Sequence, residues 1–127
     1  MEILQIDRTE YSPKIYFDPE EQFLQIKGAS RPENAKKFYA PLIEALNTFA
    51  VENIISSTPF SIEIKLSYFN SASMVYLTDA FKIISNMHSK GLKVLVDWFV
   101  DEDDDVIHEA GQELSDLTDL PFNFIED

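Results

Sequence analysis

One segment of this chain, from Ser61 to Tyr68, alternates almost strictly between apolar and polar side chains. Because successive side chains of a β-strand point to opposite faces, this pattern predicts a strand that is buried on one face only. The predicted buried face carries Ile62, Ile64, Leu66 and Tyr68. An amphipathic helix is predicted to begin directly afterwards, at about Ser71. A sheet built around such a strand carries its helices mainly on one side.

Periodic patterns predict three helices and further strands around this segment. The helices are expected over residues 35–51, 71–89 and 104–117, where apolar side chains recur at helical spacing. The strands are expected over residues 14–17, 23–27, 92–100 and 121–125, and residues 3–6 form a candidate short strand. Residues 18–21 have good turn chemistry, which predicts a hairpin between the strands that flank them. Residues 28–34 are predicted to form a loop into the first helix, with Ser30 as its cap.

The element order ββαβαβαβ predicts a single α/β domain over residues 1–127. The sheet is expected to be mixed, with right-handed crossovers and with the helices mainly on one face. This architecture resembles a STAS-like domain, the anti-anti-sigma-factor type. A flavodoxin-like, doubly wound sheet is the structural alternative, but its central strands would be apolar on both faces.

The negative charge of the chain is concentrated in its C-terminal quarter. The formal net charge is −13; residues 1–96 carry 11 acidic and 10 basic side chains, whereas residues 97–127 carry 12 acidic side chains and no Lys or Arg. Such a surface repels nucleic acid and anionic membranes, since both depend on Lys and Arg contacts. It is suited to steering a basic protein partner, and it is equally compatible with a solvated face that aids solubility.

Few residues offer catalytic or cofactor chemistry. The chain has no cysteine and only three glycines, so thiol catalysis and Gly-rich phosphate loops have no basis in it. His88 and His108 lack a motif partner for nucleophilic catalysis, which favours a surface or capping role for each. We therefore expect no cofactor and no enzymatic activity. The first residues lack a signal-peptide pattern and no apolar run approaches membrane length, so we expect a cytoplasmic protein.

The acidic run at residues 101–105 makes metal binding an alternative interpretation. An EF-hand loop that began at Asp101 would need Gly at its sixth position and Glu at its twelfth, where this chain has Val106 and Gln112. The run is better explained as the start of a helix, because carboxylates favour the positive end of the helix dipole. Asp103 or Asp104 is then the natural cap.

Small hydroxyl side chains occur where the alternating strand ends and the next helix begins. Asn70 or Ser71 is suited to cap that helix, which contributes about 1 kcal/mol. A phosphate on Ser71 or Ser73 would meet the positive end of the helix dipole and add nearly two negative charges. Capping and phosphorylation use the same exposed helix start, so both interpretations stay open. Phe99 has the opposite parity to the apolar face of its strand, which makes it a candidate partner-binding aromatic.

Three ordered motifs resemble those of the SiaC-type regulatory phosphoproteins, a bacterial family formerly described as a domain of unknown function. The resemblance covers nearly the whole chain. Residues 28–34, GASRPEN, are similar to the family's G-x-S-x-P-E-N loop. Residues 66–73, LSYFNSAS, are similar to its L-x-Y-x-N-T/S-x-S segment. Residues 98–105, followed by residues 109–111 and 121–122, are similar to its C-terminal pattern.

The resemblance implies a small STAS-like signalling regulator without catalysis of its own. It implies phosphorylation by a dedicated Ser/Thr kinase, dephosphorylation by a PP2C-type phosphatase, and partner switching in cyclic-di-GMP signalling, in which the unphosphorylated form binds a diguanylate cyclase. The modified hydroxyl would be Ser71, with Ser73 as the fallback. The expected partner-binding residues are Tyr68, Asn70, Ser71, Ser73 and Phe99. A constitutive interaction module of the anti-sigma-antagonist kind is the alternative, and an acidic metal-binding domain is a less favoured one.

Overall fold

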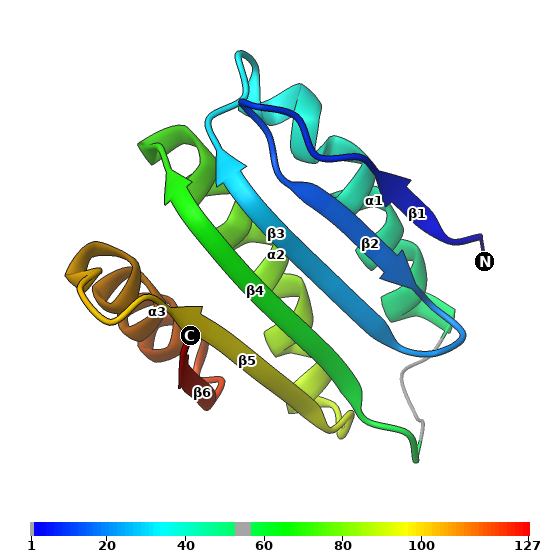
Figure 1. Ribbon diagram of the computed structural model, residues 1–127. Coiled ribbons are helices and arrows are strands. Elements are labelled where there is room, and N and C mark those ends of the chain that lie inside the picture. Colours follow the sequence, from blue (N-terminus) through cyan, green and yellow to red (C-terminus); the bar gives the residue numbers. More distant parts are fainter. Residues whose placement is uncertain (1, 53–56) are drawn as a thin grey trace.

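The computed structural model describes residues 2–52 and 57–127. Within these residues a six-stranded mixed sheet carries three helices (Figure 1). The strands are β1 (Leu4–Ile6), β2 (Lys14–Asp18), β3 (Phe23–Ser30), β4 (Phe60–Phe69), β5 (Val94–Val100) and β6 (Phe122–Glu126). The helices are α1 (Ala35–Glu52), α2 (Ser71–Ser89) and α3 (Asp105–Thr118).

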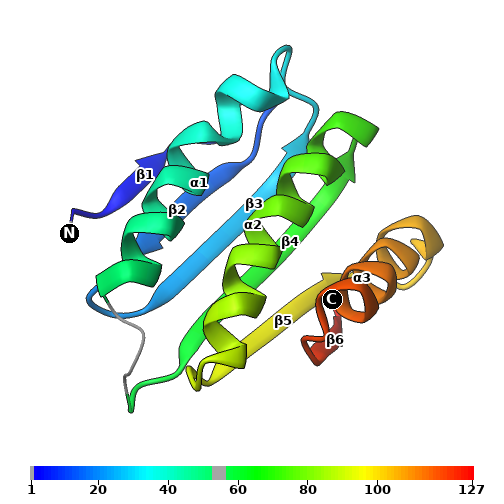
Figure 2. The same ribbon diagram turned by 180° about the vertical axis from the view of Figure 1, so that it is seen from behind.

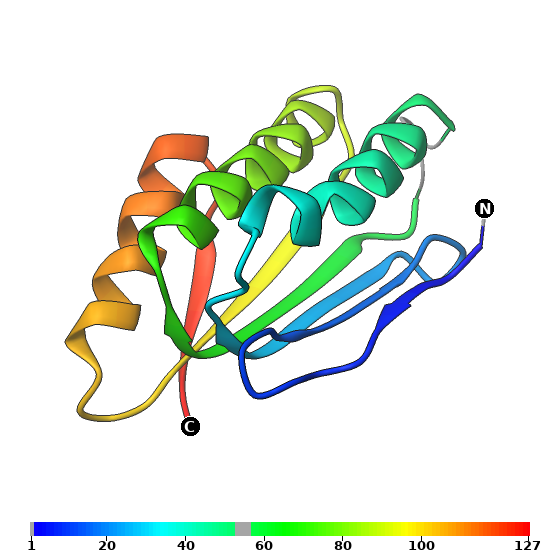
Figure 3. The same ribbon diagram turned by 90° about the horizontal axis from the view of Figure 1, so that it is seen from above.

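The strands lie in the sheet in the same order as in the chain, from β1 to β6. The first three strands pair antiparallel, and the pairs β3–β4, β4–β5 and β5–β6 are parallel. Each helix connects two neighbouring parallel strands, and all three cover the same face of the sheet (Figures 2 and 3). The prediction of a mixed α/β sheet with its helices on one face is therefore confirmed.

The core lies between the helices and the sheet. Phe17, Phe49 and Phe60 pack together there, with ring centroids 5.2–5.8 Å apart, and the alternating side chains of the strands complete it. The largest fully buried side chains are Trp98, Tyr39, Phe17, Phe49, Phe60 and Phe81. Among the described helices, none has the length and apolar character needed to cross a membrane.

Helix α2 has the bounds that the sequence predicted, residues 71–89. Helix α1 continues through Pro41, and its start is capped by Asn34, whose Oδ1 accepts a hydrogen bond from the Lys37 backbone N–H at 3.1 Å. The prediction that Ser30 caps this helix is wrong. Strand β3 extends to Ser30, so the first residues of the predicted loop are part of the sheet.

The prediction that Tyr68 shares the buried face of β4 is also wrong. The register of β3 and β4 shifts by one residue, because Gly28 pairs with Leu66 whereas Ala29 pairs with Tyr68. Side chains alternate along a strand, so the shift moves Tyr68 to the outer face, where it is 50% exposed. Phe69 packs against the core in its place.

Candidate functional site

The candidate site is the junction at which β4 ends and α2 begins. Asn70 caps α2: its backbone is extended, and its side-chain Oδ1 accepts a hydrogen bond of 2.8 Å from the Ser73 backbone N–H. The Asn70 backbone N–H donates in turn to the Ser30 carbonyl oxygen at the end of β3, at 3.0 Å. The start of α2 is therefore held to the neighbouring strand as well as to its own.

A chain of buried hydroxyls lies directly beneath this junction. The Ser30 hydroxyl donates to the Ser73 hydroxyl at 2.8 Å, and the Ser73 hydroxyl donates to the Ser30 carbonyl oxygen at 3.0 Å. Tyr39 of α1 completes the chain, with its OH 2.5 Å from Ser30 Oγ. Because each serine hydroxyl has only one proton to donate, the Tyr39 OH must be the donor to Ser30. We call these three residues the hydroxyl network.

Burial keeps the Tyr39 phenol in its neutral form. Desolvation raises the pKa of Tyr39 from 10.0 to about 12, and the hydrogen bonds with Ser30 and Ser73 oppose that rise only in part. The phenol therefore remains a proton donor throughout the physiological range. In the hydroxyl network it ties α1 to the strand that precedes it and, through Ser30, to the start of α2.

The two candidate phosphorylation residues occupy different environments. Ser71 is the first residue of α2 and is exposed. Ser73 is fully buried, and its hydroxyl both donates and accepts within the hydroxyl network. Since a kinase has to reach the hydroxyl it modifies, this burial leaves Ser71 as the candidate and gives Ser73 a structural role. For the same reason Ser73 offers no surface to a partner.

Helices α2 and α3 lie side by side on the helix-covered face (Figure 2). The residues that face each other there line an open groove. Its volume is about 560 Å³, and Ser71 is one of the residues that line it. Val75, Val106 and Leu117 also line the groove and are 56%, 65% and 63% exposed. Exposed apolar side chains gathered in a groove are typical of surfaces that bind a partner.

The charged residues along this groove are mainly acidic. Asp79, Glu109 and Glu113 line it, and Lys82 is the basic residue among its lining residues. The groove therefore combines an apolar surface with a negative rim. A partner that fits it would present apolar side chains accompanied by Lys or Arg.

The predicted partner-binding residues do not form one surface. Tyr68 and Asn70 flank the junction next to Ser71, and the Arg31 guanidinium lies 5.9 Å from the centroid of the Tyr68 ring. Phe99 instead lines a small hollow with Lys65, whose amino group lies 5.8 Å from its ring centroid. It is partly buried on the sheet face that carries no helix. Phe99 therefore belongs to a second surface, on the outer face of the sheet to which Tyr68 is also turned.

The acidic run serves as a helix start. Asp104 caps α3, with its Oδ1 accepting a hydrogen bond from the Ile107 backbone N–H at 3.0 Å. No group of three or more His, Asp or Glu side chains suited to hold a metal ion occurs among the described residues. His88 Nδ1 lies 3.1 Å from the Leu92 carbonyl oxygen, and the His108 ring packs on Phe124.

Sequence reasoning missed the hydroxyl network as a unit. Ser30 and Ser73 are 43 residues apart, and nothing in the local pattern around either residue indicates that they meet. The available signal was that each serine lies in a motif that carries the family resemblance, Ser30 in the first and Ser73 in the second.

The model of a family described as SiaC family regulatory phosphoproteins matches residues 6–127. A protein of Pseudomonas aeruginosa strain UCBPP-PA14, named only as uncharacterised, is 25% identical over 122 residues, which cover 96% of this chain and 94% of that protein.

Solved structures of SiaC from Pseudomonas aeruginosa share the fold. The crystal structure of apo-SiaC superposes with a TM-score of 0.88 at 24% identity, covering 98% of this chain and 99% of that chain. A crystal structure of the diguanylate cyclase SiaD in complex with its activator SiaC superposes with a TM-score of 0.88 at 23% identity and with the same coverage. At these identities the likeness establishes a common fold.

Proposed function

This chain belongs to the SiaC family of regulatory phosphoproteins, and from that premise we propose that phosphorylation of Ser71 switches its binding of a protein partner. The family is one of regulators, so the chain is a regulatory protein and not an enzyme. The observation that carries the proposal is the position of Ser71: it is exposed, it is the first residue of α2, and it lines the α2–α3 groove.

A phosphate on Ser71 is compatible with the folded chain. The first turn of α2 contains no acidic side chain, so the helix dipole and the free backbone N–H groups there would favour the added negative charge. The modification would therefore leave α2 in place. Its effect would fall on the surface that a partner meets.

The same phosphate would make the groove less able to bind. It would add about −1.5 to −2 charges at one end of a groove whose rim already carries Asp79, Glu109 and Glu113. Desolvating that charge under an apolar partner surface is costly, since the nearby side chains offer little compensation. Unmodified Ser71 would accordingly mark the binding-competent form.

We propose a diguanylate cyclase as the partner. SiaC of Pseudomonas aeruginosa forms a complex with the cyclase SiaD and is its activator, and shared family membership supports a similar partner for this chain. A Ser/Thr kinase and a PP2C-type phosphatase would set the phosphorylation state. This partner switching would take place in the cytoplasm, as part of cyclic-di-GMP signalling.

The test combines phosphosite mapping with binding measurements on the purified chain. Mass spectrometry of the protein isolated from its own cells should find phosphate on Ser71. Ser71→Ala should bind a diguanylate cyclase from the same genome as wild type does. Ser71→Asp should bind at least about tenfold more weakly, because a like charge at an apolar interface costs more than 1.4 kcal/mol.

Ser57→Asp is the matched control, since Ser57 is exposed at the other end of β4 and the variant adds the same charge. It should leave binding unchanged. If Ser71 never carries phosphate and Ser71→Asp binds as wild type does, the switch is refuted. Tight binding that persists in every variant would instead indicate the constitutive interaction module.

A further inference from the structure

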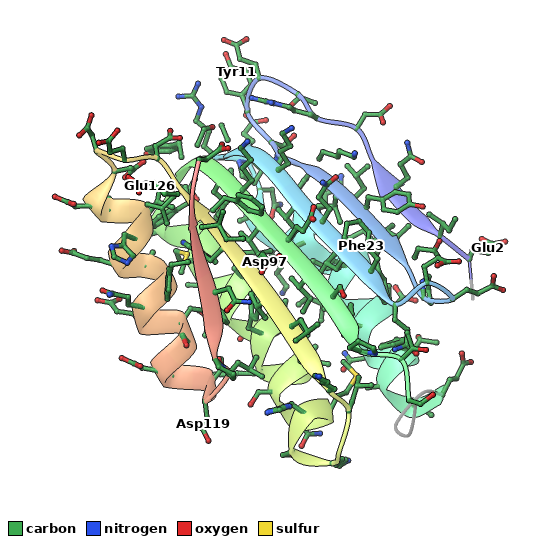
Figure 4. The ribbon with its side chains drawn as sticks, turned by 60° about the horizontal axis from the view of Figure 1, so that its bottom comes forward. Glu2, Tyr11, Phe23, Asp97, Asp119 and Glu126 are labelled. Carbon is green, nitrogen blue, oxygen red and sulfur yellow. The ribbon has the colours of Figure 1, made fainter. Side chains whose placement is uncertain are left out.

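Basic side chains gather on the face of the sheet that carries no helix. Four of the ten Lys and Arg residues of this acidic chain lie around the carboxyl ends of β3 and β4, together with two tyrosines. Figure 4 looks onto this face, with Tyr11 labelled at the tip of the loop between β1 and β2. We call this surface the basic strip, and it consists of Arg8, Tyr11, Lys27, Arg31, Lys65 and Tyr68.

At one end of the basic strip, a guanidinium lies close to two exposed aromatic rings. Arg31 is 5.3 Å from the ring centroid of Tyr11 and 5.9 Å from that of Tyr68. The rings are 56% and 50% exposed, and the Arg31 backbone N–H donates to the Tyr11 carbonyl oxygen at 2.8 Å. Both rings are close enough to attract the guanidinium, whose N–H groups can also bind an anion. Arginine and tyrosine are also the residues that dominate binding energy at protein interfaces.

At the other end, three cations line a small hollow. Arg8, Lys27 and Lys65 surround it, and its volume is about 90 Å³. Arg8 packs against Gly28, which has φ of +128°, and a Cβ there would lie 3.0 Å from Arg8 Nε. Gly28 therefore provides the space in which the guanidinium lies.

The ion pairing of the basic strip is incomplete. Asp101 and Asp127 also line the hollow, and Lys65 pairs with the Asp127 carboxylate. Within residues 2–52 and 57–127, Arg8, Lys27 and Arg31 form no ion pair, although the chain has 23 acidic residues. The Asp127 carboxylate on Lys65 shows which chemistry suits the hollow, where Arg8 and Lys27 have no ion-pair partner.

We propose that the basic strip is a docking surface for an acidic segment of a partner protein. Charge complementarity carries this choice: carboxylates would pair with Arg8 and Arg31 in charge-assisted hydrogen bonds, and the tyrosine rings would supply the apolar contact. A short acidic segment has to meet only these few cations, whereas a nucleic acid carries a continuous run of phosphates, which the net charge of −13 repels more strongly. The basic strip faces away from the α2–α3 groove, so an acidic partner and the groove's partner can bind together.

The test uses a glutamate-rich peptide, with a glutamine-rich peptide of equal length as the uncharged probe. Titrations of the full chain are followed by calorimetry and by amide chemical shifts. We expect saturable binding of the glutamate peptide alone, with shifts confined to the basic strip and affinity that falls as salt is added. The double variant Arg8→Gln, Arg31→Gln should bind at least about tenfold more weakly. Both side chains are exposed, so the variant should fold normally.

Lys90→Gln with Lys93→Gln is the matched control, because it removes the same charge from exposed residues at the opposite end of the sheet. It should retain wild-type affinity. Equal weakening in both double variants, or the absence of saturable peptide binding, overturns the proposal. Tighter binding of a polyuridylate probe would assign the strip to nucleic acid instead. Self-association that competes with the peptide would assign it to the acidic run of a second copy. None of these outcomes bears on the Ser71 switch.

Discussion

Helices α2 and α3 begin at the same end of the sheet, where the parallel strands β4 and β5 finish, but their first turns are chemically different. Both are capped in the same way, by Asn70 Oδ1 on the Ser73 N–H at 2.8 Å and by Asp104 Oδ1 on the Ile107 N–H at 3.0 Å. The first turn of α2 has no acidic side chain, whereas α3 follows the acidic run and has Asp105 in its first turn.

The buried residues that support the two helix starts differ as well. The hydroxyl network supports α2, whereas α3 rests on Trp98, whose Nε1–H donates to the Ile107 carbonyl oxygen at 2.9 Å. One added negative charge changes the local charge most at the start of α2, because no acidic side chain is present in its first turn. The start of α2 is thus suited to a phosphate switch, and the start of α3 is suited to a permanent charge.

Gly111→Ala should have the largest effect, because it acts on the support of α3. A Cβ at Gly111 would lie 2.5 Å from Trp98 Nε1, so the side chain or the helix must move. In an open helix position this change would stabilise by about 1 kcal/mol, but here overpacking should lower the free energy of unfolding by about 3 kcal/mol. Urea unfolding measures it, with exposed Gln112→Ala as the control. A variant as stable as wild type would show that α3 is not seated on Trp98.

High pH should weaken the support of α2 by a smaller amount. The pKa of Tyr39 is raised by folding, so its contribution is complete below the unfolded-state pKa near 10 and is lost as pH rises toward about 12. The free energy of unfolding should fall by about 2 kcal/mol over that window. Tyr39→Phe should flatten this part of the pH profile in urea unfolding. The variant is a fair reference because the Ser30 hydroxyl can still donate to Ser73. If the pH profiles of wild type and Tyr39→Phe run parallel, the assigned role of Tyr39 is wrong.

Removing the two caps should cost similar free energy but with different salt dependence. Asn70→Ala and Asp104→Ala should each lower the free energy of unfolding by about 1 kcal/mol. The Asp104 effect includes attraction between its charge and the helix dipole, so it should shrink in added salt, whereas the Asn70 effect should not. Denaturant unfolding at low and high salt separates the two. Identical salt responses would mean that the caps act through hydrogen bonding alone.

Ser71→Asp should have the smallest effect on stability, and its sign is informative. A negative charge in the first turn of α2 should raise the free energy of unfolding by about 0.5 kcal/mol. The neutral variant Ser71→Asn should change it by less. Thermal unfolding in low salt measures both, and a clear loss of stability in Ser71→Asp would indicate that phosphate disrupts α2 itself.

Local sequence patterns were sufficient to predict strand β4 and the helix α2 that follows it. The alternation of Ile62, Ile64 and Leu66 and the helical spacing of the residues after Ser71 both depend on immediate neighbours, so the strand and the bounds of α2 were predictable. The same reasoning predicted an exposed helix start, which holds for Ser71 but did not distinguish it from the buried Ser73.

The errors arose where a distant residue decides the structure. Gly28 within a strand pattern is a known sign of an irregular register, but its effect appears on β4, where it turns Tyr68 outward. Ser30 looked like a local cap because its partners, Tyr39 and Ser73, approach it only after the helices pack. The groove between α2 and α3 is likewise a property of packing, which the sequence of either helix alone does not contain.

The agreement between strand order and chain order has a consequence for how the protein is made. Each strand after β1 pairs with the strand that precedes it in the chain, so the sheet can grow by adding one unit at a time to an existing edge. Apart from β1, each of these strands finds its first partner already synthesised. A nascent chain can therefore begin to assemble its sheet while the ribosome is still synthesising the acidic C-terminal quarter.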